Sequence, residues 1–97
     1  MKSVGEYLKL LAVYMQIHAS VYHIKRMGIF GSVARGEQTE RSDIDICFEG
    51  EAPDLFTLVH IKYELEALLG RPVDLVRIRE RMDKVLKQTI QKEALYV

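Results

Sequence analysis

The amino-terminal segment places the tightest constraint on how this chain can fold. Residues 3–20 are mainly apolar, with no proline and no glycine after Gly5, so they predict a helix. The apolar residues lie on two faces of that helix, with Leu8, Leu11 and Met15 on one and Leu10, Tyr14 and Ile17 on the other. A helix that is apolar on more than one face is usually buried on more than one face. The rest of the chain, or a partner, must therefore cover both.

The remaining sequence alternates short strand patterns with helical ones. We expect strands at residues 24–30, 43–49 and 73–78, helices at 55–69 and 82–95, and a turn or a single helical turn at 32–36. This order of elements, α-β-(turn)-β-α-β-α, predicts an α+β fold, an α/β sandwich built on a small sheet.

The two later helices carry signals for their ends and for their buried faces. Asp54 is a suitable N-cap for helix 55–69, and Gly70 is a suitable stop, with Pro72 shortly after it. The stripe of that helix expected to face the core is Leu55, Leu58, Val59, Leu65 and Leu69. In helix 82–95 the residues expected to face inward are Met82, Val85, Leu86 and Ile90.

Length, charge and cysteine content exclude several classes of protein. The 97 residues predict one domain, residues 1–97, and leave no room for two. Lys plus Arg (14) equals Asp plus Glu (14), without the basic excess that nucleic-acid binding usually needs. Glu6 and Lys9 interrupt the first apolar run, which is also too short to span a membrane, so we expect a structural helix there and not a leader. The single Cys47 lies in an apolar run, which indicates a buried side chain and a cytoplasmic location.

Gly31 and Ser32 follow a predicted strand directly and begin a helical turn. Glycine lets the backbone approach a ligand closely, and the free N–H groups of such a turn can hold phosphate oxygens together with the Ser32 hydroxyl. Taken alone the pair is a weak signal, because most Gly-Ser pairs after strands are only turns.

Three aspartates lie in predicted strands. Strand alternation puts Asp43 and Asp45 on one face, with Ile44 and Ile46 directed to the core. Two such carboxylates repel each other, and Mg²⁺ would relieve the repulsion, although two ordinary surface acids are the simpler explanation. Asp74 stands inside Val-Asp-Leu-Val, where a buried carboxylate needs a partner. If the two strands are neighbours, the three acids meet and suit a two-metal site.

The combination of these features resembles a known family. Gly31-Ser32-Val33-Ala34-Arg35-Gly36, followed by Ser42-Asp43-Ile44-Asp45-Ile46 and by an acid in a later strand, is similar to the signature of polymerase-beta-type nucleotidyltransferases. On so short a chain it resembles the minimal nucleotidyltransferase subgroup. The resemblance implies a nucleotidyltransferase-like fold, with a small mixed sheet flanked by helices.

The resemblance also implies roles for individual residues. Gly31 and Ser32 would bind the triphosphate, with Ser42 counted among the nucleotide-binding residues. Asp43 and Asp45 would ligate two Mg²⁺ ions, and Asp74 matches the third acid, which helps to hold the metal that activates the attacking hydroxyl. Arg35 lies close enough in sequence to contact phosphate, but it could equally pair with Glu37 or an aspartate and hold the loop.

The family resemblance implies an ATP-using enzyme that moves AMP to a hydroxyl. Minimal members are commonly antitoxins of helical HEPN-type ribonuclease toxins, thought to silence the toxin by attaching AMP to a tyrosine. Two alternatives remain: the catalytic subunit of an antibiotic nucleotidyltransferase, and a non-catalytic module that blocks a toxin by contact. The apolar helix 3–20, or the last helix, is expected to form an oligomer with the toxin or with a second copy, unless helix 82–95 covers its open face.

Overall fold

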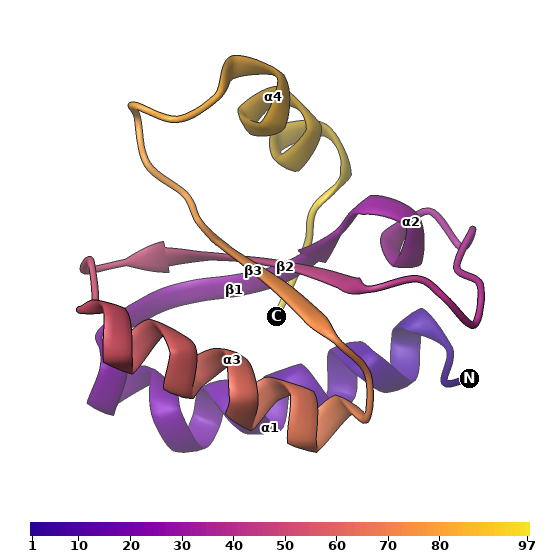
Figure 1. Cartoon of the computed structure of the whole chain (residues 1–97), viewed down its shortest axis with the longest axis horizontal. Coiled ribbons are helices and arrows are strands. Elements are labelled where there is room, and N and C mark those ends of the chain that lie inside the picture. The colour runs from indigo at the N-terminus through magenta and orange to yellow at the C-terminus, as the bar shows by residue number, and fades with distance from the viewer.

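The computed structural model describes residues 1–97. Along the chain the elements are α1 (Val4–Tyr22), β1 (Ile24–Phe30), α2 (Gly31–Ala34), β2 (Ile44–Gly50), α3 (Leu55–Leu69), β3 (Val73–Arg77), α4 (Lys84–Glu93) and β4 (Leu95–Tyr96). The predicted α+β fold is confirmed, because helices flank a small mixed sheet on both faces (Figure 1).

The sheet has four strands in the order β3-β2-β1-β4. β1 pairs antiparallel with both β2 and β4, whereas β2 and β3 are parallel. A parallel neighbour requires a crossover connection, and α3 provides it between β2 and β3. This crossover brings the aspartate of β3 beside the aspartates at the start of β2.

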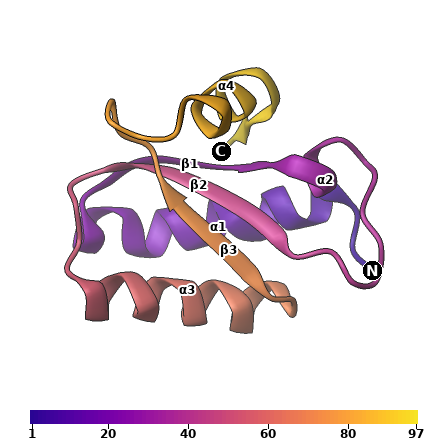
Figure 2. The ribbon, with the colours of Figure 1, turned by 45° about the horizontal axis from the view of Figure 1, so that its top comes forward.

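One face of the sheet is covered by α1 and α3, which lie side by side in both ribbon views (Figures 1 and 2). Fourteen buried residues form the main hydrophobic cluster, thirteen of them from these helices and the sheet and one, Val33, from α2. Alternate residues of β2, namely Ile44, Ile46 and Phe48, belong to that cluster. The predicted alternation is therefore confirmed for Ile44 and Ile46.

The other face of the sheet is covered only by α4 (Figure 2). The cluster on this side has three buried residues, Phe30, Cys47 and Ile90, with Met82 and Leu86 partly buried against it. Cys47 is fully buried and unpaired, in agreement with the sequence prediction. Much of this face therefore remains available to polar side chains.

The helix boundaries follow local chemistry. Ser3 and Glu6 form a reciprocal capping box at the start of α1. The side chain of Asp54 accepts a hydrogen bond from the Thr57 N–H at 2.7 Å, and Gly70 ends α3 in the left-handed conformation at φ 72°. Both predicted boundaries of α3 are confirmed, and none of the helices is long and apolar enough to cross a membrane.

Several predictions about which side chains are buried are wrong. Tyr14 is buried at 3% exposure, because its hydroxyl donates to Glu64 on α3, and only Ile17 of the second α1 face is clearly open. The last helix does not cover α1, because α4 packs on the opposite face of the sheet. Leu55, Val59 and Val85 point to solvent. The helix expected over 82–95 spans only Lys84–Glu93, and Leu95 begins β4 beside β1.

Candidate functional site

Asp45 and Asp74 are brought together by the parallel pairing of β2 with β3. In that register Asp45 is directly opposite Asp74, as Ile44 is opposite Val73 and Ile46 is opposite Leu75. Since residues 44 and 46 face the α1/α3 layer, the two aspartates face the side covered by α4. The expectation that both acids share one face is therefore met by the register itself.

Asp43 precedes β2 by one residue, so the strand begins later than the predicted residue 43. The chain is already fixed there, because the Ile44 N–H donates to the Pro72 carbonyl at 2.9 Å. Asp43 and Asp74 are both exposed, whereas Asp45 is partly buried. The idea that Asp74 is buried within its strand is wrong: β3 is an edge strand and leaves this carboxylate in solvent.

Gly31 lies at the junction of β1 and α2 and touches the carboxylate of Asp45. Its φ is +75°, a left-handed conformation that favours glycine. A Cβ on Gly31 would collide with Oδ2 of Asp45 and would lie 3.0 Å from Cγ of the same side chain. Any other residue here would therefore displace the carboxylate as well as strain the backbone.

The first turn of α2 follows this glycine. Its N-cap residue, Phe30, makes no side-chain hydrogen bond to the helix, so the leading N–H groups have no side-chain acceptor. Ser32 lies in this turn and is partly buried, beside the Asp45 contact of Gly31. Backbone N–H groups and a hydroxyl next to paired carboxylates can bind phosphate oxygens and an accompanying cation.

The electrostatics of the site disfavour the ionised form of Asp45. Partial burial raises the pKa of Asp45, and the negative charges of Asp74 and then Asp43 raise it further. As the side chains stand, no group of three or more His, Cys, Asp or Glu residues is arranged to hold a metal ion unaided. The predicted three-acid cluster is therefore not a closed cage. It fits Mg²⁺, which usually takes one or two carboxylates and completes its shell with water and substrate phosphates.

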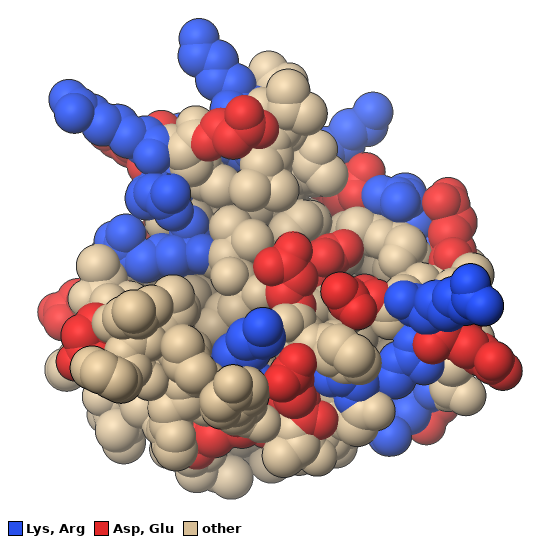
Figure 3. All heavy atoms as spheres, in the orientation of Figure 1, with Lys and Arg blue, Asp and Glu red and all other residues tan.

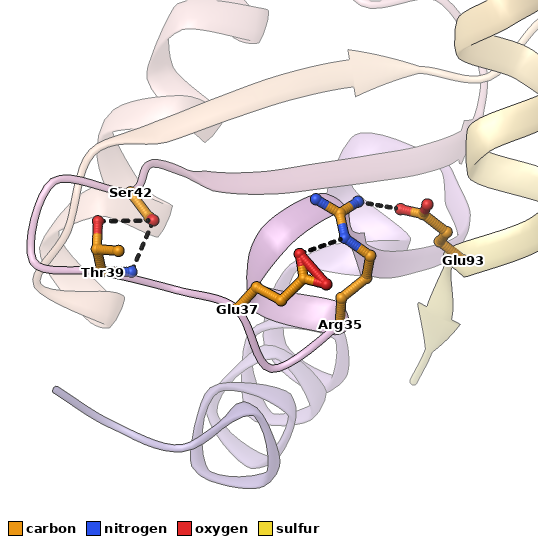
Figure 4. A network of polar contacts seen from close by, with 5 residues as sticks. All are labelled: Arg35, Glu37, Thr39, Ser42 and Glu93. Atoms are coloured by element: carbon orange, nitrogen blue, oxygen red, sulfur yellow. Dashed lines mark hydrogen bonds and ion pairs between the residues drawn. The ribbon is translucent and has the colours of Figure 1, made fainter.

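Arg35 holds the loop after α2 in the structure. Its Nε donates to Glu37 at 3.2 Å, and a terminal guanidinium nitrogen donates to Glu93 of α4 at 2.8 Å (Figure 4). The hydrogen bonds to Glu37 and then to Glu93 raise the pKa of Arg35. Of the two roles considered for Arg35, these contacts correspond to holding the loop. Glu93 was not predicted as a partner, because the contact joins residues 58 apart in sequence.

Ser42 shapes the loop that leads into the aspartates. Its Oγ accepts from the Thr39 N–H at 2.8 Å and lies 3.3 Å from the Thr39 hydroxyl (Figure 4). One nitrogen of Arg71 also donates to the carbonyls of Thr39, Glu40 and Ser42. Arg71 therefore anchors the loop before Asp43 to the start of β3, and the sequence analysis missed it because the contact is long-range.

Acidic side chains gather on the sheet side of the view in Figure 3. They lie near the middle, over the region where β2 and β3 overlap in Figure 1. Basic side chains gather at the upper left, over the loop before α4, and others lie among acidic ones at the right of the view. The local excess of negative charge at the strand ends fits a site for a cation carried by a polyphosphate.

Comparisons of sequence identify the class of enzymes to which a chain with this fold belongs, the nucleotidyltransferases. A family model described as a nucleotidyltransferase domain matches residues 15–97. MJ0128 of Methanocaldococcus jannaschii, named as a candidate protein adenylyltransferase, is 39% identical over the full length of both chains. The protein adenylyltransferase MntA of Thermococcus cleftensis is 38% identical over 78% of this chain and 77% of its own. The chain belongs to the nucleotidyltransferase domain family and is an enzyme of that family.

Solved structures resemble the whole fold. A minimal nucleotidyltransferase is 31% identical with a TM-score of 0.74, over 97% of this chain and 95% of its own. A toxin–antitoxin complex with AMP-PNP gives a TM-score of 0.76 at 24% identity, covering 91% and 69% of the two chains. A tri-AMPylated Shewanella oneidensis HEPN toxin with its MNT antitoxin gives 0.66 at 21% identity, covering 92% and 68%. The last two likenesses concern the fold alone.

Proposed function

We propose that this chain transfers AMP from ATP to a hydroxyl in a Mg²⁺-dependent reaction. The observation that carries the proposal is the placement of Asp45 opposite Asp74 and against Gly31, so that carboxylates and a phosphate-binding turn share one site. Asp43, Asp45 and Asp74 would hold two Mg²⁺ ions. Gly31, Ser32 and Ser42 are assigned to the triphosphate, and Arg35, which pairs with Glu37 and Glu93, to holding the loop beside it. All of these residues are assigned to one domain, residues 1–97.

The reaction forms one bond and breaks one. The acceptor oxygen attacks the α-phosphorus in line, the bond from that phosphorus to the oxygen bridging to the β-phosphate breaks, and pyrophosphate leaves with that oxygen. The acceptor proton passes to a nearby carboxylate or to water. Bound Mg²⁺ supplies charge neutralisation for the phosphate oxygens and lowers the pKa of the acceptor hydroxyl. The protein's contribution is to position both reactants and to keep Asp45 against Gly31.

The nucleotide and the acceptor are proposed from different support. ATP is favoured because relatives are named adenylyltransferases and a similar fold was solved with AMP-PNP. A tyrosine of a helical HEPN-type toxin is the proposed acceptor, because the similar Shewanella oneidensis complex pairs an AMPylated HEPN toxin with an MNT antitoxin. The chain would then act as an antitoxin in the cytoplasm, where an unpaired cysteine such as Cys47 stays reduced.

The test is co-expression with a HEPN-type protein encoded beside this chain, followed by intact mass of both proteins. We expect the partner to gain one or more AMP units at a tyrosine, and to gain none with Asp45→Asn. Glu49→Gln is the matched control, because Glu49 lies on the same strand and face four residues further on and pairs with Arg26. A silenced partner of unchanged mass would instead indicate a contact-only antitoxin. AMP transfer to a small molecule alone would indicate the antibiotic-modifying alternative.

A further inference from the structure

The outer surface of α1 and α3, on the side away from the sheet, carries most of the protein's exposed large apolar side chains. We call it the two-helix face. Its exposed apolar side chains are Val13, Ile17 and Val21 of α1 and Leu55, Phe56, Val59 and Tyr63 of α3. Phe56 is 86% exposed and Ile17 is 62% exposed. In Figure 3 the surface over the first half of α3 is mostly uncharged.

The exposed positions of α3 carry no carboxylate, lysine or arginine. They are Leu55, Phe56, Val59, His60, Tyr63 and Ala67, whereas the helix's Lys62, Glu64 and Glu66 are partly buried at its sides. Seven of the twelve large apolar side chains that the protein leaves exposed lie on this one face, and a standard protein interface takes about 800 Å² from each partner. A soluble protein rarely leaves so much contiguous apolar surface uncovered.

A groove of about 410 Å³ runs between α1 and α3 within this face. Its apolar walls are Val13, Ile17, Ala67 and Leu68. The carboxylate at its floor, Glu64, accepts hydrogen bonds from the hydroxyls of Tyr14 at 3.1 Å and Tyr22 at 2.8 Å. An apolar side chain could therefore fill the groove without leaving this carboxylate unpaired.

The spacing of the exposed α3 residues suits packing against a second, antiparallel α3. Residues 56, 60, 63 and 67 recur at intervals of four, three and four, the pattern of a helix–helix seam. A two-fold axis between positions 61 and 62 places residue 56 opposite residue 67 of the other copy, and 60 opposite 63. The largest exposed side chain, Phe56, then meets the smallest, Ala67, at the groove.

We propose that the two-helix face is a homodimer interface in which Phe56 of each copy inserts into the groove of the other. Two-fold symmetry makes this contact occur twice, as expected when one surface carries both the knob and the hole. The aspartates lie on the opposite face of the sheet, so both sites stay open to acceptors. The inference does not depend on the proposed function, since the dimer needs neither nucleotide nor acceptor.

The first experiment measures the mass of the full chain in solution by light scattering and sedimentation. We expect twice the chain mass of 11.2 kDa for the native protein and 11.2 kDa for Phe56→Glu. Val85→Glu is the matched control, because Val85 is also exposed on a helix, at 71%, but lies on α4 across the sheet. Circular dichroism should show both variants folded. A monomeric native chain, or an undiminished Phe56→Glu dimer, overturns the proposal.

The second experiment tests the register. Residues 56 and 67 are about 16 Å apart along one helix, so a disulfide between them in Phe56→Cys/Ala67→Cys must join two chains. We expect this double variant to cross-link as a dimer on oxidation and Phe56→Cys alone not to, while buried Cys47 stays unreacted. Equal cross-linking of both variants would refute the register. If the native chain is monomeric and Phe56→Glu abolishes only toxin binding, the face belongs to the toxin and the homodimer is wrong.

Discussion

The two faces of the sheet are built for different purposes. Beneath the sheet, α1 and α3 enclose fourteen buried residues in one apolar cluster. Above it, α4 covers only three, and the rest of that face holds paired carboxylates, the turn proposed to bind phosphate and the Arg35–Glu93 contact. Each fully buried aliphatic or aromatic side chain contributes roughly 1.5–3 kcal/mol, so most of the folding free energy comes from the lower face.

The group of aspartates on the upper face opposes folding. Burial and the neighbouring aspartates raise the pKa of Asp45, which means that its ionised form is disfavoured where it stands. Strands β1, β2 and β3 connect the faces, because alternate residues of one strand enter the core and the site. A small enzyme can thus hold a strained acidic site in register by anchoring the opposite side of the same strands.

The largest effect we expect separates activity from stability on the upper face. Asp45→Asn should lower AMP transfer by at least about a thousandfold, at the upper end for removal of one electrostatic group from an active site. It should leave the fold intact and raise the metal-free melting temperature slightly, because the repulsion from Asp74 and Asp43 is removed. Labelled-ATP transfer and thermal melting in EDTA measure the two quantities.

Asp74→Asn should also lower AMP transfer, but by less than Asp45→Asn, since this carboxylate is exposed at the sheet edge. Glu49→Gln again serves as the control and should change neither quantity appreciably. Near-normal turnover in Asp45→Asn would break the assignment of chemistry to this face.

A matched pair of truncations tests the division of stability. Leu65 of α3 is 0% exposed in the main cluster, so Leu65→Ala should lower the free energy of unfolding by about 2–5 kcal/mol. Leu86 of α4 is partly buried beside the small cluster, so Leu86→Ala should cost about 1 kcal/mol. Urea unfolding at equal protein concentration measures both. Equal losses would contradict the comparison between the faces.

The sequence predicts most of the lower face, because local signals and periodicity act there. The ends of α3 follow from Asp54 and Gly70, and the inward direction of Ile44 and Ile46 follows from strand alternation. The helical pattern mispredicts burial where a polar group pairs with a residue that is distant in sequence. Tyr14 reads as an open position in the helix, yet its hydroxyl reaches Glu64, 50 residues later.

The upper face is less predictable from local patterns. The motif residues and the face of Asp74 are foreseen, but the register that sets Asp45 opposite Asp74 depends on a crossover of the whole α3 helix. Arg71 and Glu93 act through contacts about 30 and 58 residues away in sequence, which no local pattern encodes. Leu95 fits a helical period, but pairing with β1 gives it strand structure instead, so tertiary contacts override local preference.

The last effect we expect is a small one that links metal, pH and stability through Asp45. The pKa of this side chain is raised in the folded state. At a pH just above the ordinary pKa of 3.8, the native protein therefore binds more protons than the unfolded chain. In EDTA, stability should therefore fall as pH rises from 3.8 through the raised pKa, and this component should be absent in Asp45→Asn. Mg²⁺ should restore stability on the high-pH side, by about 1.4 kcal/mol at ten times its Kd. Melting temperatures of both proteins, with Mg²⁺ or EDTA across this range, measure the difference. The difference between the melting temperatures of the two proteins cancels the contribution of the other carboxylates. An equal change of melting temperature with Mg²⁺ in both proteins would show that Asp45 does not hold the ion.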